Sequence, residues 1–374
     1  MKILIAPDKF KGSLAADEVC QAIQKGINKY DSNIEILLHP LADGGEGTID
    51  ILGKLMNLEN VEIEVHDPLL RPIFSFYKKN HDTAFIEMAS ASGLELLKKK
   101  KRNPMNTSTF GTGELILDAI QKGVKKIYLF IGGSATNDAG IGMAAALGFR
   151  FFDKKNKLLS PVGKNLIHIH SIDAAPIKID FSKIQINVVC DVENILFGKN
   201  GAAHVYASQK GASLSEIKSL DLGLQNYSKQ ITKHFQKDIS QIKGAGAAGG
   251  LGAGAMIFLN AKIQSGIQTI LQITDFEKKL EGVDLVITGE GKLDAQTLEG
   301  KVIKGVADIS KKKNIPVDVI CGVCELSVLQ LKKLGIRTVE PILREGVTLH
   351  QAISEAAERV EEITYLMVKN HYLK

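Results

Sequence analysis

The sequence predicts a two-domain α/β protein, in which one domain is made from both chain ends and the other is inserted between them. Its 374 residues exceed the roughly 250–300 that one hydrophobic core usually supports. Strands and helices alternate over residues 1–65 and 283–374, which is typical of a parallel sheet covered by helices. Residues 66–282 start with consecutive strands that indicate a meander, so we assign them to an inserted, mixed α/β domain.

The first domain begins with an apolar strand over residues 2–6. Ser13 can cap the helix that follows, whose apolar residues recur with a helical period. A second strand and a second helix come next. The remaining elements of this domain are strands over residues 285–288, 317–320 and 337–340 and a last helix over residues 348–368.

A meander leads into the inserted domain, and its strands are expected over residues 61–65, 73–77 and 83–88. Its other predicted elements are helices over residues 111–122, 138–147 and 215–235 and strands over residues 127–131 and 186–190. Residues 242–254 are so rich in glycine that we expect a loop there. A cleft between the two domains is the expected active site.

Composition excludes several classes of protein. A net charge of +5 on 47 basic and 42 acidic residues is too small to indicate a nucleic-acid-binding protein, and tryptophan is absent. Four cysteines in so long a chain do not form the disulfide framework of a secreted domain. No apolar stretch reaches the roughly 18 residues of a membrane span, and the chain begins directly with a strand, so we expect a cytoplasmic protein.

Four predicted strands run into loops of glycine, hydroxyl and acidic residues that open a helix. They lie within residues 2–13, 37–48, 126–140 and 284–301. Loops at the carboxyl ends of strands bind ligands in open α/β proteins. Glycine lets backbone N–H groups approach a phosphate, and a helix N-terminus favours its negative charge. The pattern predicts an enzyme that handles a phosphorylated small molecule.

The loops differ in charge and therefore in expected role. Lys9, Lys11 and Ser13 suit an anion, or the lysines are simply solvated. Asp43 and Glu46 suit a metal ion or substrate hydroxyls, although Asp43 or Thr48 could instead cap a helix.

Three further segments carry polar groups suited to the same chemistry. Residues 111–114 and 132–138 are rich in donors that can cradle a phosphate, and Asp138 could cap its helix or hold a magnesium-bound water. Asp191 follows a strand and is a candidate general base for a substrate hydroxyl, or a surface acid in a turn. Residues 288–294 hold two acids and a lysine, which fit metal–phosphate chemistry or a salt-bridged loop.

Residues 244–249 match G-x-G-x-x-G, but no clear strand precedes them and no acid follows at the required spacing. These glycines are expected to let the backbone approach a nucleotide or a neighbouring helix. The P-loop pattern and the protein-kinase signatures are absent, which excludes both of those classes.

Together the loops resemble those of the bacterial glycerate kinases of type I. The matching segments are residues 6–13, 42–48, 111–113, 132–140, 190–191, 244–254 and 288–301, and they span nearly the whole chain. The resemblance implies a flavodoxin-like first domain and transfer of the ATP γ-phosphate to D-glycerate with Mg²⁺, with 2-phosphoglycerate favoured over 3-phosphoglycerate. Residues 206–211, YASQKG, stand where the family usually has FGPQKG.

Under this resemblance each candidate residue receives a role. Asp191 is the base, with Asp138 as the alternative, and Lys9 acts at the reacting phosphate. The substrate-binding residues are Lys11, Ser13, Arg71, Asp43, Gly44 and Gly45. The phosphate-binding or nucleotide-binding residues are Thr112, Ser134, Thr136, Asn137, Gly246 and Gly249. The expected metal ligands are Asp43 with Glu290 or Asp294.

Three other functions stay open. The first is a kinase of another small hydroxy acid, and the second is an NAD(P)-dependent oxidoreductase that uses residues 244–249. The third is a non-catalytic anion-binding protein that uses the basic run at residues 98–102. The expected partners are D-glycerate and ATP, without nucleic acid or membrane, and a homodimer is one option for the assembly.

Overall fold

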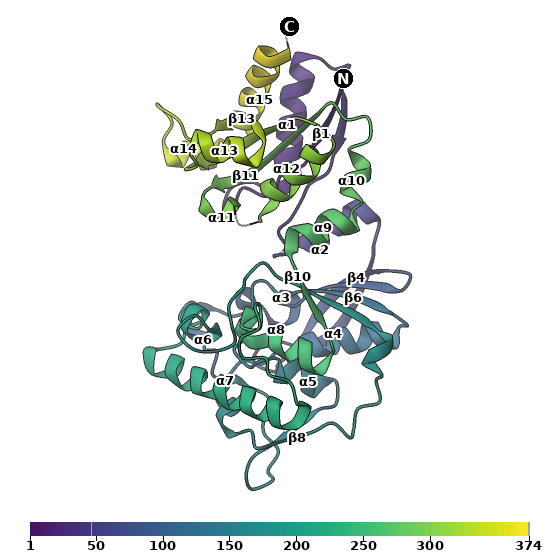
Figure 1. Ribbon diagram of the computed structural model, residues 1–374, viewed down its shortest axis with the longest axis vertical. Coiled ribbons are helices and arrows are strands. Elements are labelled where there is room, and N and C mark those ends of the chain that lie inside the picture. Colours follow the sequence, from purple (N-terminus) through teal and green to yellow (C-terminus); the bar gives the residue numbers. More distant parts are fainter. Residues whose placement is uncertain (46, 299, 373–374) are drawn as a thin grey trace. The chain divides into compact units, whose positions relative to one another are not determined.

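The computed structural model describes residues 1–45, 47–298 and 300–372. Its chain divides into two compact units, which Figure 1 shows by sequence colour. Met1–Asp43 and Gly266–Lys374 make up the first unit, and Gly44–Ser265 make up the second. The first unit therefore consists of both ends of the chain.

The first unit is built on a five-stranded, fully parallel sheet. Its order is β13-β12-β11-β1-β2. The strands are β1 (Lys2–Ile5), β2 (Glu35–Leu38), β11 (Leu285–Leu293), β12 (Val317–Cys324) and β13 (Ile336–Pro341). Counted along the chain within this sheet, the order is 2-1-3-4-5, as in flavodoxin. The strand order reverses direction between β1 and β11, which makes their carboxyl ends a topological switch point.

Helices surround this sheet: α1 (Ala16–Tyr30), α9 (Gly266–Ile273), α10 (Phe276–Lys279), α11 (Ala295–Leu298), α12 (Val302–Lys312), α13 (Val328–Leu334), α14 (Leu349–Ser354) and α15 (Ala356–Tyr372). α1 and α15 pack closely, because Gly26 faces the backbone of α15 where a Cβ atom would lie 2.4 Å from the Glu361 carbonyl oxygen. Val19, Ile23 and Val360 belong to the core on this side. The predicted last helix is in fact two helices that break at Glu355.

The second unit contains a six-stranded mixed sheet in the order β10-β9-β6-β5-β4-β3. Its strands are β3 (Glu59–His66), β4 (Pro72–Asn80), β5 (Thr83–Glu87), β6 (Lys126–Phe130), β9 (Gln185–Val189) and β10 (Lys262–Gln264). β3, β4 and β5 pair antiparallel, which confirms the predicted meander, and β5, β6, β9 and β10 are parallel. β7 (Arg150–Phe152) and β8 (Ser171–Asp173) form a separate antiparallel pair. Parallel and mixed sheets with helices confirm the predicted α/β class.

The helices of this unit are α2 (Thr48–Met56), α3 (Ala89–Ser92), α4 (Phe110–Gln121), α5 (Ile141–Ala146), α6 (Ala202–Tyr206), α7 (Leu214–Phe235) and α8 (Ala247–Phe258). Short 3₁₀ turns are η1 (Leu94–Leu96), η2 (Lys99–Lys101), η3 (Gly163–His168) and η4 (Phe181–Lys183). The basic run lies in η2 with its lysines exposed, and its Arg102 pairs with Glu95. None of the described helices combines the length and apolar character needed to cross a bilayer.

The glycine-rich stretch over residues 242–254 corrects one prediction, because much of it is helix α8 and not a loop. The helix is kinked near its start, where Ala248, Gly249 and Gly250 have φ values of 51°, 70° and 91°. Glycine favours loops by propensity, but these small residues serve close packing: a Cβ atom on Gly252 would lie 2.2 Å from the Gly244 carbonyl oxygen. The helix is almost entirely buried.

Candidate functional site

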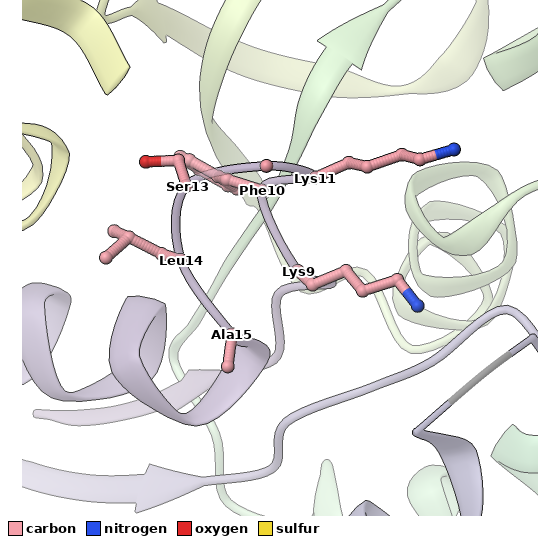
Figure 2. A pocket seen from close by; sticks show the side chains of 7 residues that line it. Lys9, Phe10, Lys11, Ser13, Leu14 and Ala15 are labelled. Atoms are coloured by element: carbon pink, nitrogen blue, oxygen red, sulfur yellow. The ribbon is translucent and has the colours of Figure 1, made fainter. Parts of the chain in front are cut away.

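The lysine loop of the first unit follows β1. Phe10 and Leu14 pair across a tight turn, in which Gly12 has a φ of 81°, and the buried Phe10 ring anchors it. Figure 2 shows Lys9 and Lys11 extending to one side of the pocket that this loop lines, while Ser13 points to the other. The loop therefore presents two cationic side chains in one direction, at the switch point where a flavodoxin-like sheet binds its ligand.

Ser13 does not cap α1, contrary to the prediction. Its hydroxyl donates to the Ile353 carbonyl at 2.8 Å, and the helix begins only at Ala16. The backbone N–H of Ala15 is instead bonded by the carboxylate of Glu18 at 2.8 Å. The turn from Phe10 to Leu14 separates Ser13 from the helix start, so its hydroxyl is directed toward α14.

Three carboxyl groups gather near the lysine loop. Burial, and then the negative charge of Asp43, raises the pKa of Asp8 to about 7, and Glu290 adds to this shift. Burial also raises the pKa of Glu290, which accepts a hydrogen bond from the Thr297 hydroxyl. The charges of Asp43 and Glu290 thus act on each other and on Asp8, an acid to which sequence reasoning gave no role.

Asp294 lies at the edge of this group. Its carboxylate accepts from the backbone N–H of Gln296 at 2.9 Å and lies 3.7 Å from Lys292 Nζ. Across the described ranges, no three His, Cys, Asp or Glu side chains are arranged to hold a metal ion by themselves. Mg²⁺ is usually bound by one or two carboxylates together with waters and substrate phosphates, so a pair such as Asp43 and Glu290 fits a nucleotide-bound ion.

In the second unit, the loop after β6 lies against two neighbouring segments. Gly133, Ser134 and Ala135 run beside residues 92–94 through backbone contacts, including Ala135 N to Ser92 O at 2.9 Å. Gly132 contacts Gly45, because a Cβ atom at Gly132 would lie 3.1 Å from the Gly45 Cα. The structure therefore places the predicted substrate residues Gly44 and Gly45 beside the predicted phosphate loop. Glu46, the second acid predicted there, lies outside the described residues.

Asp138 is completely buried at the end of this loop. Its carboxylate accepts from Thr109 N at 2.7 Å, Thr109 Oγ1 at 2.8 Å, Gly142 N at 3.1 Å and Gly140 N at 3.2 Å. Burial raises its pKa, and these donors oppose the increase. The acceptor positions of Asp138 are thus occupied by the chain itself, and the carboxylate joins the start of α5 to the segment before α4.

Thr112 is also completely buried, and its hydroxyl donates to Ser92 Oγ at 2.8 Å.

The glycines at the start of α8 lie close to the backbone of neighbouring loops. A Cβ atom at Gly249 would lie 2.0 Å from the Thr136 carbonyl oxygen, and one at Gly246 would lie 2.1 Å from the Ile195 carbonyl oxygen. These glycines let α8 approach the loops after β6 and β9, so their close contacts are with the chain's own backbone.

Asp191 lies in a different environment. It follows β9, its side chain is exposed, and its carboxylate accepts a hydrogen bond from Ser265 Oγ at 3.2 Å. The neighbouring thiol of Cys190 is no competitor for proton transfer near neutrality, since burial raises its pKa to about 11. Of the two predicted bases, Asp191 is exposed and Asp138 is buried.

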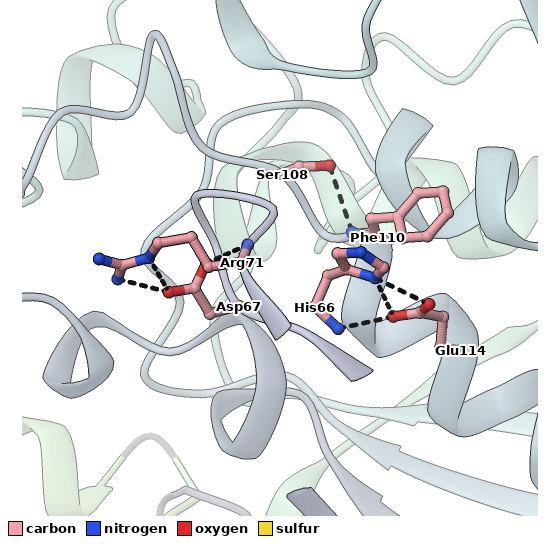
Figure 3. A network of polar contacts seen from close by, with 6 residues as sticks. All are labelled: His66, Asp67, Arg71, Ser108, Phe110 and Glu114. Atoms are coloured by element: carbon pink, nitrogen blue, oxygen red, sulfur yellow. Dashed lines mark hydrogen bonds and ion pairs between the residues drawn. The ribbon is translucent and has the colours of Figure 1, made fainter. Parts of the chain in front are cut away.

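Arg71 is held by Asp67, as Figure 3 shows. The buried Asp67 carboxylate accepts from Arg71 Nε at 2.7 Å and from the Arg71 backbone at 3.0 Å, and Arg71 Nη2 completes the pair. Leu70, between them, has a φ of 59°, which is rare for a residue with a side chain. The same figure shows His66 bonded to Glu114. The turn presents a half-exposed guanidinium in a fixed direction.

Sequence reasoning missed two further residues that support the loops of the second unit. Glu87 ends β5 and caps α2, accepting from Ile49 N at 2.9 Å and also from the backbones of Gly47 and Thr48. Lys210 is buried against the loop after β6 and donates to Ser134 Oγ at 2.6 Å. Neither belongs to a glycine-rich segment. Lys210 lies in the Gln-Lys-Gly end of residues 206–211, which agrees with the family pattern, and that agreement is the signal that could have marked it.

Comparison with known proteins identifies the family. The model of the glycerate kinase family matches residues 3–371. A glycerate kinase of Bacillus cereus is 43% identical over 96% of this chain and 95% of its own, and a glycerate 2-kinase of Escherichia coli is 41% identical with the same coverage. A solved structure assigned to glycerate kinase 2 of Salmonella typhimurium LT2 superimposes with a TM-score of 0.87 at 40% identity, covering 99% of this chain and 98% of that one. The chain belongs to the glycerate kinase family.

Proposed function

We propose that this protein is an ATP-dependent glycerate kinase whose product is 2-phosphoglycerate. The observation that carries the proposal is the pair of lysines beside Asp43 and Glu290 at the switch point of the first unit, in a chain of the glycerate kinase family. Among the relatives, the Escherichia coli protein is named a glycerate 2-kinase, which favours the 2-phosphate. We further propose that the two compact units are the two domains of the enzyme.

Phosphoryl transfer requires mainly positioning and the neutralisation of negative charge. Lys9 and Lys11 contact anionic oxygens of the phosphoryl group or of the glycerate carboxylate. Arg71 is the second candidate for the carboxylate, since its guanidinium is already oriented by Asp67. Ser134 supplies a hydroxyl donor to a phosphate oxygen.

Asp191 is the proposed general base. It is exposed and can accept the proton of the glycerate hydroxyl as that oxygen attacks the γ-phosphorus. Asp138 is the less suitable candidate, because four internal donors occupy its carboxylate.

Asp43 and Glu290 are the residues that would hold a nucleotide-bound Mg²⁺, with Asp294 as the alternative to Glu290. When bound, the ion neutralises charge on the β- and γ-phosphate oxygens. Asp8 is protonated in part near neutrality and limits the negative charge of this group before a cation arrives.

Incubation with Mg-ATP and D-glycerate, followed by phosphorus NMR, tests the proposal. The expected product signal is that of 2-phosphoglycerate. A 3-phosphoglycerate signal would retain the kinase and change the regiochemistry. ADP formation only with other hydroxy acids would indicate a different acceptor, and folded protein that consumes no ATP would overturn the kinase assignment.

A further inference from the structure

A buried lysine that forms no salt bridge with any of the described residues lies inside the second unit. Lys210 follows α6, and its side chain turns inward so that the residue is only 3% exposed. Its Nζ donates to Ser134 Oγ at 2.6 Å and to the Thr136 carbonyl at 2.7 Å, both on the loop after β6. Burial lowers the pKa of Lys210 to about 7, and the nearby Asp138 charge opposes this. A buried charge held only by neutral acceptors is costly, which calls for a functional explanation.

The chemistry of this hydrogen bond fixes the direction of the Ser134 hydroxyl. In its charged form Lys210 can only donate, so Ser134 Oγ is then the acceptor in its bond with Lys210. The hydroxyl hydrogen must then point elsewhere. Over the ranges that the structure describes, the Ser134 hydroxyl donates to no protein acceptor. The residue is 8% exposed to solvent. Ser134 is therefore arranged as a donor without an acceptor.

The next residues of the loop show the same incompleteness. Thr136 and Asn137 are completely buried, yet Thr136 Oγ1 and both polar side-chain atoms of Asn137 have no hydrogen-bond partner within the described chain. Buried polar atoms are normally satisfied, so three such atoms on one loop point to a group that completes the network when it binds. Together with Lys210 they favour an anion.

We propose that Lys210 is a positioning residue for phosphoryl transfer, which fixes the Ser134 hydroxyl as a hydrogen-bond donor to a phosphate oxygen of the nucleotide. The inference rests on the proposed function, because it takes ATP as the ligand. The same contact with the Thr136 carbonyl holds the loop in place. Lys210 strengthens the Ser134 donor by polarising its oxygen, as charge-assisted hydrogen bonds do.

A double-mutant cycle tests whether Lys210 acts through Ser134. Lys210→Met, Ser134→Ala and the double variant are compared with the wild type in the dissociation constant for ATP, measured by calorimetry, and in kcat and KM. Each single variant should lower kcat/KM for ATP by roughly 10- to 100-fold. The kcat/KM of the double variant should lie within about threefold of that of the more impaired single variant. Effects that multiply would show that Lys210 and Ser134 act separately, which would overturn the inference.

Matched variants keep the test decisive. Lys183→Met makes the same chemical change at an exposed lysine and should leave ATP affinity and kcat unchanged. If Lys210→Met does not fold, Lys210→Ala replaces it in the cycle, because alanine also removes the hydrogen bond that Lys210 donates to Ser134. Unchanged ATP affinity and kinetics in either folded Lys210 variant would overturn the inference while the kinase stands.

The proposed function can fail separately from this inference. A wild-type protein that binds ATP but phosphorylates no glycerate would contradict the function, and the cycle in ATP affinity would still decide the role of Lys210. A wild-type protein that binds no ATP would overturn both.

Discussion

At the scale of single residues, two acids at strand ends of the same unit have opposite environments. Asp138 is surrounded by four internal donors, whereas Asp191 is exposed with a serine beside it. A carboxylate that serves as a base must reach a substrate proton. The resemblance ranked Asp191 before Asp138, but the sequence did not show the physical reason, since the donors to Asp138 come partly from Thr109, 29 positions away.

Asp191→Asn should lower kcat by roughly 10²- to 10⁴-fold, because an amide cannot accept the glycerate proton. Thermal unfolding should change little, as the side chain is exposed. Steady-state kinetics with ATP and D-glycerate provide the measurement, and Asp275→Asn, at an exposed acid just before α10, is the control. A loss of less than tenfold in folded protein would remove Asp191 from this role.

Asp8 predicts a pH dependence of stability. Its pKa is 3.8 in an ordinary environment and about 7 in the fold, so between these values the folded state holds a proton that the unfolded state has lost. The free energy of unfolding that Asp8 contributes therefore falls as the pH rises from about 4 to about 7, and stays low above that. Asp8→Asn removes this dependence. The free energy of unfolding of the variant should therefore increase relative to that of the wild type as the pH rises across this interval.

Urea unfolding at pH 5 and pH 8 measures the effect, with an expected scale of about 1.4 kcal/mol for each unit of pKa shift. Asp43→Asn is the informative second variant. It removes a negative charge that raises the pKa of Asp8, and should shift the transition toward lower pH. A difference between Asp8→Asn and the wild type that is constant with pH would contradict this account.

At the scale of elements, the loops after β1, β6 and β9 are where the sequence predicted them. An apolar run indicates a buried strand, and glycine and hydroxyl residues directly after it indicate that the strand ends in a loop. Helix starts were less predictable. Ser13 suits a cap by its type, but the turn of Phe10 directs its hydroxyl to Ile353. The glycines of α8 suit a loop by propensity, yet tertiary packing against the loops after β6 and β9 outweighs that preference.

Gly249→Ala tests the packing of α8. The new Cβ atom would lie 2.0 Å from the Thr136 carbonyl oxygen, at a residue with a φ of 70°. Gly123→Ala is the matched control, since Gly123 has a φ of 84° but no atom within 4 Å of the added Cβ. The control should cost about 1–2 kcal/mol from backbone strain, and Gly249→Ala about 1–3 kcal/mol more because it must also displace Thr136. Equal losses in urea unfolding would show that the close contact is unimportant.

At the scale of the whole molecule, the sequence was sufficient for the α/β class, the parallel and mixed sheets and the family, because these depend on patterns repeated along the chain. The residues that hold the loops of the candidate site in place were not predictable in the same way. Lys210 meets Ser134 from 76 positions away, and Glu87 caps a helix 38 positions before it. Contacts of this kind are set by which strand ends become neighbours, and no local pattern encodes them.

The strand connectivity predicts that the second unit folds alone. Its six-stranded sheet uses only strands between residues 59 and 264, and its core cluster lies between residues 61 and 261. The first unit needs both chain ends, because β1 lies between β2 and β11. A chain of residues 44–265 should therefore unfold cooperatively on heating and keep its near-ultraviolet circular dichroism.

A chain of residues 1–265 is the matched comparison. It retains β1 and β2 but loses β11, the neighbour that pairs with β1 along its other edge. Its N-terminal 43 residues should be removed by protease while residues 44–265 persist, because two strands and one helix do not bury enough apolar surface to be stable. Loss of cooperative unfolding in both chains would show that the second unit depends on the first, and that the two units form a single folding unit.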